Sequence, residues 1–162
     1  MTAREKFSDP IHSAVEKAGL ALLILLWIYV GFTYMDLPES IPVHFNGKGE
    51  PDSFADKSMF FMLPLLATLL FAGLNWLKQY PEYLNYPVRI TEENAARQYR
   101  NVRRMILVLN TIIILTFWAI CIGTVLVANG EADGLGDWFI PLFLFLSLGT
   151  TFYFLFKGYK TG

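Results

Sequence analysis

The sequence lacks charged residues over four long stretches. None of its 13 basic and 14 acidic residues falls within residues 18–35, 58–77, 105–130 or 138–156. A charge at the centre of a membrane-spanning helix costs about 2.5–3.5 kcal/mol, whereas roughly 20 apolar residues cross a hydrocarbon core of ~30 Å. The absence of charge therefore excludes an ordinary soluble domain and predicts four membrane spans, at about residues 18–35, 58–77, 105–128 and 138–156.

Cysteine and histidine are also scarce. The chain has one cysteine, Cys121, and two histidines, His12 and His44. A lone cysteine cannot form an intramolecular disulfide, so we expect Cys121 to pack inside the third span. A metal site at His44 would need further ligands, and His12 precedes the first span, on the opposite side of the predicted membrane. We therefore expect no metal site and no cofactor.

Sequence motifs of catalysis are missing as well. There is no HExxH, no glycine-rich phosphate loop, no Cys-x-x-Cys and no nucleophile elbow. The predicted spans hold no acidic or basic side chain, and such groups usually mark ion or proton routes through a membrane. We therefore expect no enzymatic activity and no nucleic-acid partner. A small transporter is a weaker hypothesis than the two given below, because only a few polar residues in the spans support it.

Hydrophobic residues, in contrast, are abundant. They make up 54% of the chain, aromatic residues make up 16%, and the mean hydropathy is +0.41. This content is more than a soluble domain of this length can bury, so lipid must be the main solvent. We predict an all-α fold, a four-helix bundle that forms a single membrane domain over residues 1–162, with an ordered extracytoplasmic loop between spans one and two. The first span is expected to be a retained anchor rather than a cleaved signal.

The basic residues predict the orientation of this bundle. Of the 13 bases, only Lys48 and Lys57 lie in the first or third connection, and the others lie before span one, in the second connection or in the tail. The first and third connections are instead rich in Asp and Glu. By the positive-inside rule, both termini and the second connection face the cytoplasm.

The first connection, residues 37–57, has an ordered chemistry. Pro38 and Pro42 stiffen the chain, and a short extended apolar run follows through Phe45. Asn46-Gly47 is a pair that readily forms a hairpin turn with positive φ, and Gly49 adds a second permissive position. Asp52 or Asp56 can then cap the helix that enters span two. We expect a rigid lid whose aromatic side chains, Phe45 and Phe54, settle on the mouth of the bundle.

His44 has two readings within this lid. It could bind a ligand or respond to pH, because histidine changes its charge between about pH 5 and 8. The structural reading, which we favour, is a hydrogen bond from the imidazole to a carbonyl or carboxylate of the same loop.

The second connection predicts a basic helical face. Thr91 offers an N-cap hydroxyl, and Glu92 and Glu93 suit the first turn, so a helix should begin near Glu92 and continue into span three. On that helix the side chains of Arg97, Arg100 and Arg104 share one face. Such a face beside a membrane most often meets anionic lipid headgroups, and docking of a cytoplasmic protein is the alternative.

The first connection resembles the signature of a bacterial family of domains of unknown function, DUF1648. The pattern is a proline-rich exit from a first span, Pro-x-His-Phe, a glycine-containing turn, and an aspartate and a lysine before a second span. The matching residues are Pro38, Pro42, His44, Phe45, Asn46, Gly49, Asp52 and Lys57. The DUF1648-like region covers about residues 18–77, and the similarity continues to residue 104.

This resemblance implies a place and a role for the protein. The same domain occurs at the front of SdpI-type toxin-immunity proteins, which are similar to membrane receptors that protect a cell from an exported toxin. By that resemblance we expect a protein of the bacterial cytoplasmic (inner) membrane that acts as a sensor or immunity component. It would recognise an extracytoplasmic peptide or protein through binding residues Pro42, His44, Phe45, Asn46, Gly49, Asp52 and Lys57. The alternative is a structural or accessory subunit of a membrane complex, with no ligand of its own.

Overall fold

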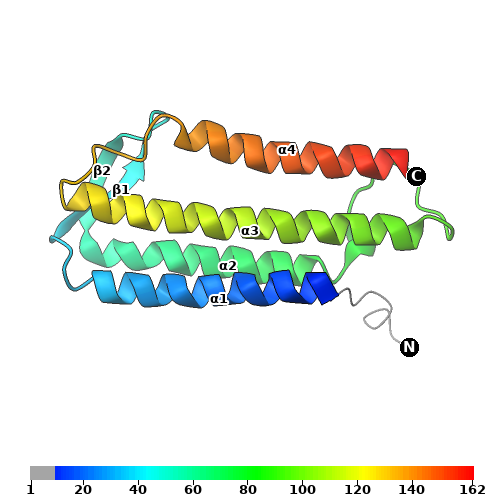
Figure 1. The fold of residues 1–162 in the computed structure, drawn as a ribbon, viewed down its shortest axis with the longest axis horizontal. Coiled ribbons are helices and arrows are strands. Elements are labelled where there is room, and N and C mark those ends of the chain that lie inside the picture. The colour runs from blue at the N-terminus through cyan, green and yellow to red at the C-terminus, as the bar shows by residue number, and fades with distance from the viewer. Residues whose placement is uncertain (1–9) are drawn as a thin grey trace.

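The computed structural model describes residues 10–162, and the side chains from residue 12 onward. Four long helices dominate it: α1 (Pro10–Thr33), α2 (Met62–Leu77), α3 (Ala95–Ala128) and α4 (Phe139–Lys160). A two-stranded hairpin, β1 (Ser40–Phe45) and β2 (Pro51–Asp56), joins α1 to the short helix η2 (Lys57–Phe61) that leads into α2. A second short helix, η3 (Pro81–Tyr83), lies between α2 and α3 (Figure 1).

Within the described residues, four helices are long and apolar enough to cross a membrane. They cover the four spans predicted from the absence of charge, apart from one or two residues at an end of the first and fourth, so the chain is a multi-pass membrane protein with the expected helical fold. The hairpin and the α3–α4 connection lie at one end of the helices, which we call the hairpin end. The start of α3 and the C-terminus lie at the other, which we call the arginine end (Figure 1).

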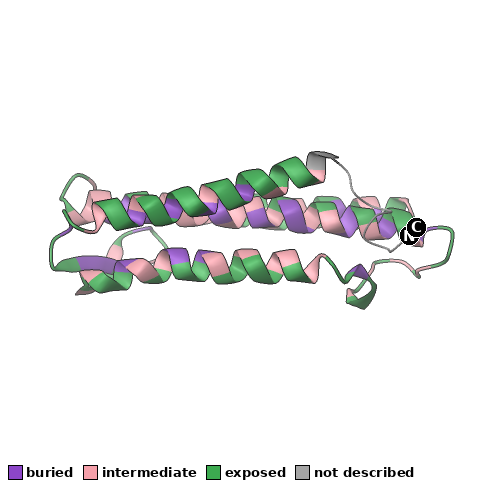
Figure 2. Cartoon of the chain, turned by 90° about the horizontal axis from the view of Figure 1, so that it is seen from below, coloured by how far each residue is buried: buried purple, intermediate pink, exposed green. Residues whose placement is uncertain are grey.

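The helices are not packed equally. The buried core lies between α1, α2 and α3 and includes Leu26, Val30, Ala67 and Cys121, each with no exposed surface. Helix α4 packs chiefly against α3 and is the least buried of the four. Figure 2 shows that buried residues are the minority and that exposed and intermediate residues cover most of the helices, as expected where lipid replaces water as the solvent. The predicted packing of Cys121 inside the third span is confirmed.

Helix α3 is the longest element. At 34 residues and 1.5 Å per residue it extends for about 51 Å, well beyond the ~30 Å of a hydrocarbon core. It begins at Ala95, three residues later than expected. Thr91 and Asn94 exchange hydrogen bonds between their side chains and backbone N–H groups, and this closed turn delays the first helical residue.

Two amide side chains fix α4 to α3 at the arginine end. Gln98 Nε2 donates to the backbone oxygen of Gly158 at 2.8 Å, and Asn101 Nδ2 donates to that of Phe154 at 2.8 Å. Both amide residues are buried. These bonds orient the tail end of α4, while the hairpin orients its beginning.

Candidate functional site

The hairpin is the most specialised local structure of the chain. Its strands are antiparallel, with Ile41 opposite Ala55 and Pro42 opposite Phe54, and the register shifts on both sides of His44. Asp56 then caps η2 by accepting the Ser58 backbone N–H at 2.8 Å, so one of the two predicted caps is confirmed. Hydrogen bonds from Ser58, through its side chain and its backbone, lower the pKa of Asp56.

The turn of the hairpin differs from the one expected. Among the described residues Gly49 has a positive φ, 77°, whereas Gly47 does not. Instead of an Asn-Gly turn, Asn46 closes a longer loop, in which its side-chain oxygen accepts the backbone N–H groups of Lys48 and Glu50. The predicted turn type is therefore wrong, and Gly49 rather than Gly47 supplies the positive φ of this loop.

Gly49 also holds the turn against the α3–α4 connection. The backbone N–H of Leu135 donates to the oxygen of Gly49 at 2.7 Å. A Cβ on Gly49 would lie 2.4 Å from the backbone oxygen of Gly136, and a Cβ on Gly134 would lie 2.2 Å from that of Gly49. Glycine is thus required on both sides of this contact, which we call the glycine contact.

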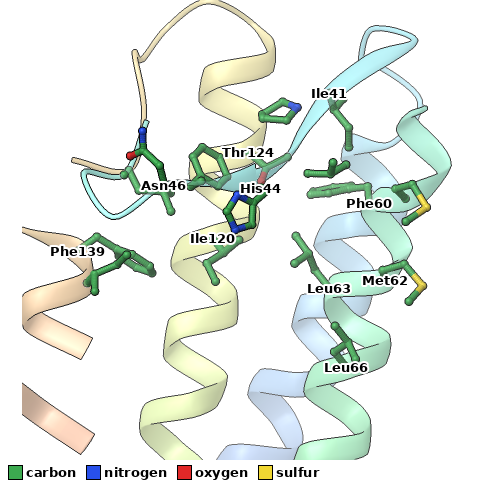
Figure 3. Close-up of a pocket in the computed structure, with 17 residues that line it drawn as sticks. Ile41, His44, Asn46, Phe60, Met62, Leu63, Leu66, Ile120, Thr124 and Phe139 are labelled. Atoms are coloured by element: carbon green, nitrogen blue, oxygen red, sulfur yellow. The ribbon is translucent and has the colours of Figure 1, made fainter. Parts of the chain in front are cut away.

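An apolar pocket lies beneath the hairpin. It has a volume of about 310 Å³, at the lower end of the ~300–1,000 Å³ typical of ligand pockets. Figure 3 shows the hairpin above it, with α2, α3 and the start of α4 around it. Its lining comes from the hairpin (Ile41, Pro42, Val43, His44, Phe45, Asn46, Gly49), from η2 and α2 (Met59, Phe60, Met62, Leu63, Leu66), from α3 (Ile120, Thr124) and from the α3–α4 region (Leu135, Phe139, Ile140).

Polar groups stand at the rim of this pocket. The His44 ring projects from the hairpin into it (Figure 3), and its Nδ1 lies 2.5 Å from Oδ1 of Asp52. Asn46 Nδ2 donates to Oε2 of Glu50 at 2.9 Å. Asp52 and Glu50 are both exposed. Two carboxylates therefore stand beside the pocket, and each contacts a residue that lines it. The expected contact of His44 with a loop carboxylate is present, and its ring faces the pocket as well.

The structure brings together most of the predicted binding residues. Pro42, His44, Phe45, Asn46 and Gly49 line the pocket, and Asp52 reaches it through His44. Lys57 does not join them. Its Nζ lies at the base of the hairpin, 3.0 Å from Oε1 of Glu39 and above the ring of Tyr34.

The two aromatic side chains of the hairpin behave differently from each other. Phe45 lines the pocket as expected, but Phe54 is 57% exposed and does not line it. Phe54 lies opposite Pro42 on β2, and no residue of β2 lines the pocket. The pocket residues from α2, α3 and α4 were not identified from the sequence, because their apolar side chains look the same as those that face lipid.

The arginine end carries the predicted basic face. Arg97, Arg100 and Arg104 are all exposed on α3, and Arg104 Nε lies 3.2 Å from Nε2 of His12 on α1. Glu16 of α1 pairs with Lys78 at the end of α2 at 2.7 Å. These contacts join three helices at the arginine end.

The second connection folds back beside this face. The Tyr86 hydroxyl donates to the backbone oxygen of Pro81 at 2.7 Å, and its ring lies against that of Tyr99. Burial, and then the proximity of Tyr99, raise the pKa of Tyr86. A second cavity of about 280 Å³ lies alongside, lined by residues that include Glu82, Glu92 and Arg103.

Comparison with known proteins identifies the hairpin region. Residues 21–68 match the family described as "Domain of unknown function (DUF1648)". This segment is a DUF1648 domain. It runs from α1 through the hairpin into the first turns of α2, so the DUF1648 domain supplies the hairpin and one wall of the pocket.

One curated relative extends beyond the domain. An "Uncharacterized protein" of Archaeoglobus fulgidus is 30% identical over 95 residues, which are 54% of this chain and 52% of the relative. The chain thus spans about half the length of this curated relative. The relative is archaeal, so the bacterial origin stays a prediction. No solved structure matches the chain.

Proposed function

We propose that this protein recognises a ligand outside the cell through the hairpin and its pocket, as a non-catalytic sensor or immunity component of the SdpI type. The observation that carries the proposal is the pocket itself, which combines an apolar lining with the inward-facing His44 and two flanking carboxylates. A passive connector between two spans has no need of such an arrangement. The DUF1648 match to the same segment supports the assignment.

The proposed orientation follows from charge. The arginine end faces the cytoplasm of a bacterial inner membrane, together with both termini, and the hairpin end faces outward. A ligand that arrives from outside then meets the pocket first. The glycine contact joins the hairpin to the connection between α3 and α4. The pocket is lined by residues of α2, α3 and α4, so a ligand in it touches three of the four helices.

The test is photo-crosslinking in living cells, with the crosslinking residue placed at Phe45. Phe54 is the matched control, because it belongs to the same hairpin but does not line the pocket. We expect a secreted peptide or protein, identified by mass spectrometry, to be captured at position 45 and not at position 54. The proposal would be contradicted if position 45 captured only lipid or other copies of the protein. It would also be contradicted if positions 45 and 54 captured the peptide equally.

A structural or accessory subunit is the second candidate function. The glycine contact favours it, since a hairpin whose only task is to close the bundle would be fixed to the α3–α4 connection in this way. Stable co-purification with a larger membrane complex, together with an empty crosslinking result at Phe45, would support this candidate over recognition.

The basic face is proposed to bind the anionic inner surface of the membrane, with a docked cytoplasmic protein as the alternative. Each Lys or Arg near such a surface contributes about 1 kcal/mol. Replacing Arg97, Arg100 and Arg104 by Gln should therefore reduce the anionic phospholipid that co-purifies with the protein. Unchanged lipid content with loss of a soluble partner would favour protein docking.

A further inference from the structure

The hairpin end has a strongly one-sided charge. Its connections carry eight acidic residues, Asp36, Glu39, Glu50, Asp52, Asp56, Glu131, Asp133 and Asp137, against two basic residues, Lys48 and Lys57. Lys57 is already paired with Glu39. The pocket therefore lies at the acidic end of the molecule, which attracts cations and repels anions.

Two of these acids are built into the rim of the pocket. Asp52 and Glu50 each hold a lining residue, His44 and Asn46, through one carboxylate oxygen. A carboxylate has about four acceptor sites, so both groups keep the capacity to accept a hydrogen bond from an ammonium or guanidinium group. The rim thus joins an apolar cavity to two exposed negative charges.

We propose that the occupant of the pocket is a cationic amphipathic peptide, an inference that rests on the proposed function and names its ligand class. An apolar side chain of the peptide enters the cavity between Leu63, Leu66 and Ile120, and its Lys or Arg groups bind Glu50 and Asp52. A phospholipid is the competing occupant, because the lower pocket residues belong to the spans. The phosphate of a phospholipid would meet the acidic rim, and this repulsion argues against it.

The experiment uses the full-length protein in nanodiscs of zwitterionic lipid. The probes are a synthetic amphipathic Leu/Lys peptide and a Leu/Glu peptide of the same length and pattern. Fluorescence anisotropy of each labelled peptide is measured with loaded and with empty nanodiscs, and the difference reports binding to the protein. We expect saturable binding of the Leu/Lys peptide and none of the Leu/Glu peptide.

Matched variants test the two parts of the site separately. Glu50→Gln with Asp52→Asn keeps the oxygens that hold Asn46 and His44 but removes the charge, and should weaken binding by about tenfold. Asp36→Asn with Glu131→Gln removes two charges of the same end that neither line the pocket nor bond a lining residue in the described contacts. This control pair should change the affinity by less than about twofold.

The apolar part is tested by filling the pocket. Leu66 lines it and is 43% exposed, so Leu66→Trp should fold and block the apolar side chain of the peptide. Leu69→Trp is the control on the same helix, at a position that is 60% exposed and outside the pocket lining. We expect loss of Leu/Lys binding in Leu66→Trp and retention in Leu69→Trp, with equal melting temperatures for both.

Each outcome decides between the occupants. Equal binding of the two peptides, or no effect of Glu50→Gln with Asp52→Asn, would overturn the inference. The inference would also be overturned if native mass spectrometry showed a phospholipid bound to the protein that Leu66→Trp removes and Glu50→Gln with Asp52→Asn does not. Capture of a neutral or acidic secreted peptide at Phe45 in cells would overturn the inference while leaving the proposed function intact. Absence of any captured peptide in cells would contradict the proposed function, whereas the ligand class is decided by the binding measurements in nanodiscs.

Discussion

At the scale of single residues, glycine determines how the hairpin meets the rest of the molecule. Gly49 combines a positive φ with a backbone approach so close that no side chain fits. Gly134 is the other half of this contact, because a Cβ there would lie 2.2 Å from the backbone oxygen of Gly49. The position of the turn thus depends on the absence of two side chains rather than on an attraction between side chains.

The first prediction concerns Gly49→Ala. The substitution forces a left-handed backbone on alanine and a collision with Gly136, so it should destabilise the protein by more than about 1 kcal/mol. Gly47→Ala is the control, since a Cβ there meets nothing within 4 Å, and it should change stability by less than about 0.5 kcal/mol. Melting temperatures in detergent micelles compare the two, and equal values would show that the glycine contact is not required.

At the scale of elements, α4 depends on its two ends. Its middle is largely exposed, and lipid supplies no hydrophobic force that would press it against α3. At the arginine end the buried amides of Gln98 and Asn101 hold backbone oxygens of α4, and at the hairpin end α4 follows the connection that carries the glycine contact. The helix is therefore fixed by polar contacts near the membrane surfaces.

Gln98→Ala should loosen this attachment. The change removes a buried donor and leaves the oxygen of Gly158 without this partner, at a cost of about 1–3 kcal/mol. Arg97→Ala, at the exposed neighbouring position, should cost less than about 0.5 kcal/mol. Hydrogen exchange read by mass spectrometry should also rise over residues 154–161 in Gln98→Ala alone. Unchanged exchange there would mean that other contacts hold α4.

At the scale of the whole molecule, the two ends carry opposite chemistry. The hairpin end is acidic and encloses an apolar pocket, whereas the arginine end is basic and joins α1, α2 and α3 by an ion pair and a hydrogen bond. Under the positive-inside rule this polarity predicts that the hairpin end is the outer one, and the proposed function requires that orientation.

Cysteine labelling tests the orientation. Gly47→Cys lies on an open turn and should react with a membrane-impermeant thiol reagent from outside the cell, whereas Glu93→Cys, exposed before α3, should not. Gln98, in the first turn of α3, is unsuitable for this test because the residue is 1% exposed and would not react on either side. The native Cys121 is buried and gives no background. Labelling of position 93 but not of position 47 would reverse the orientation.

The sequence by itself determined the spans, the hairpin and the basic face. These depend on local chemistry: the cost of charge in lipid, the turn residues from Asn46 to Gly49, and the helical spacing of three arginines. The hydrogen bond of His44 to a carboxylate could also be foreseen, because both partners belong to one short loop.

Only the tertiary structure decided the pocket, the glycine contact and the placement of α4. An apolar side chain on a membrane helix has the same sequence character whether it faces lipid, like Leu69, or a cavity, like Leu66. The pairing of Gly49 with Leu135, and that of Gln98 with Gly158, join segments far apart in the chain. No local propensity encodes such pairings, since they arise only when the helices pack and bring the two backbones together.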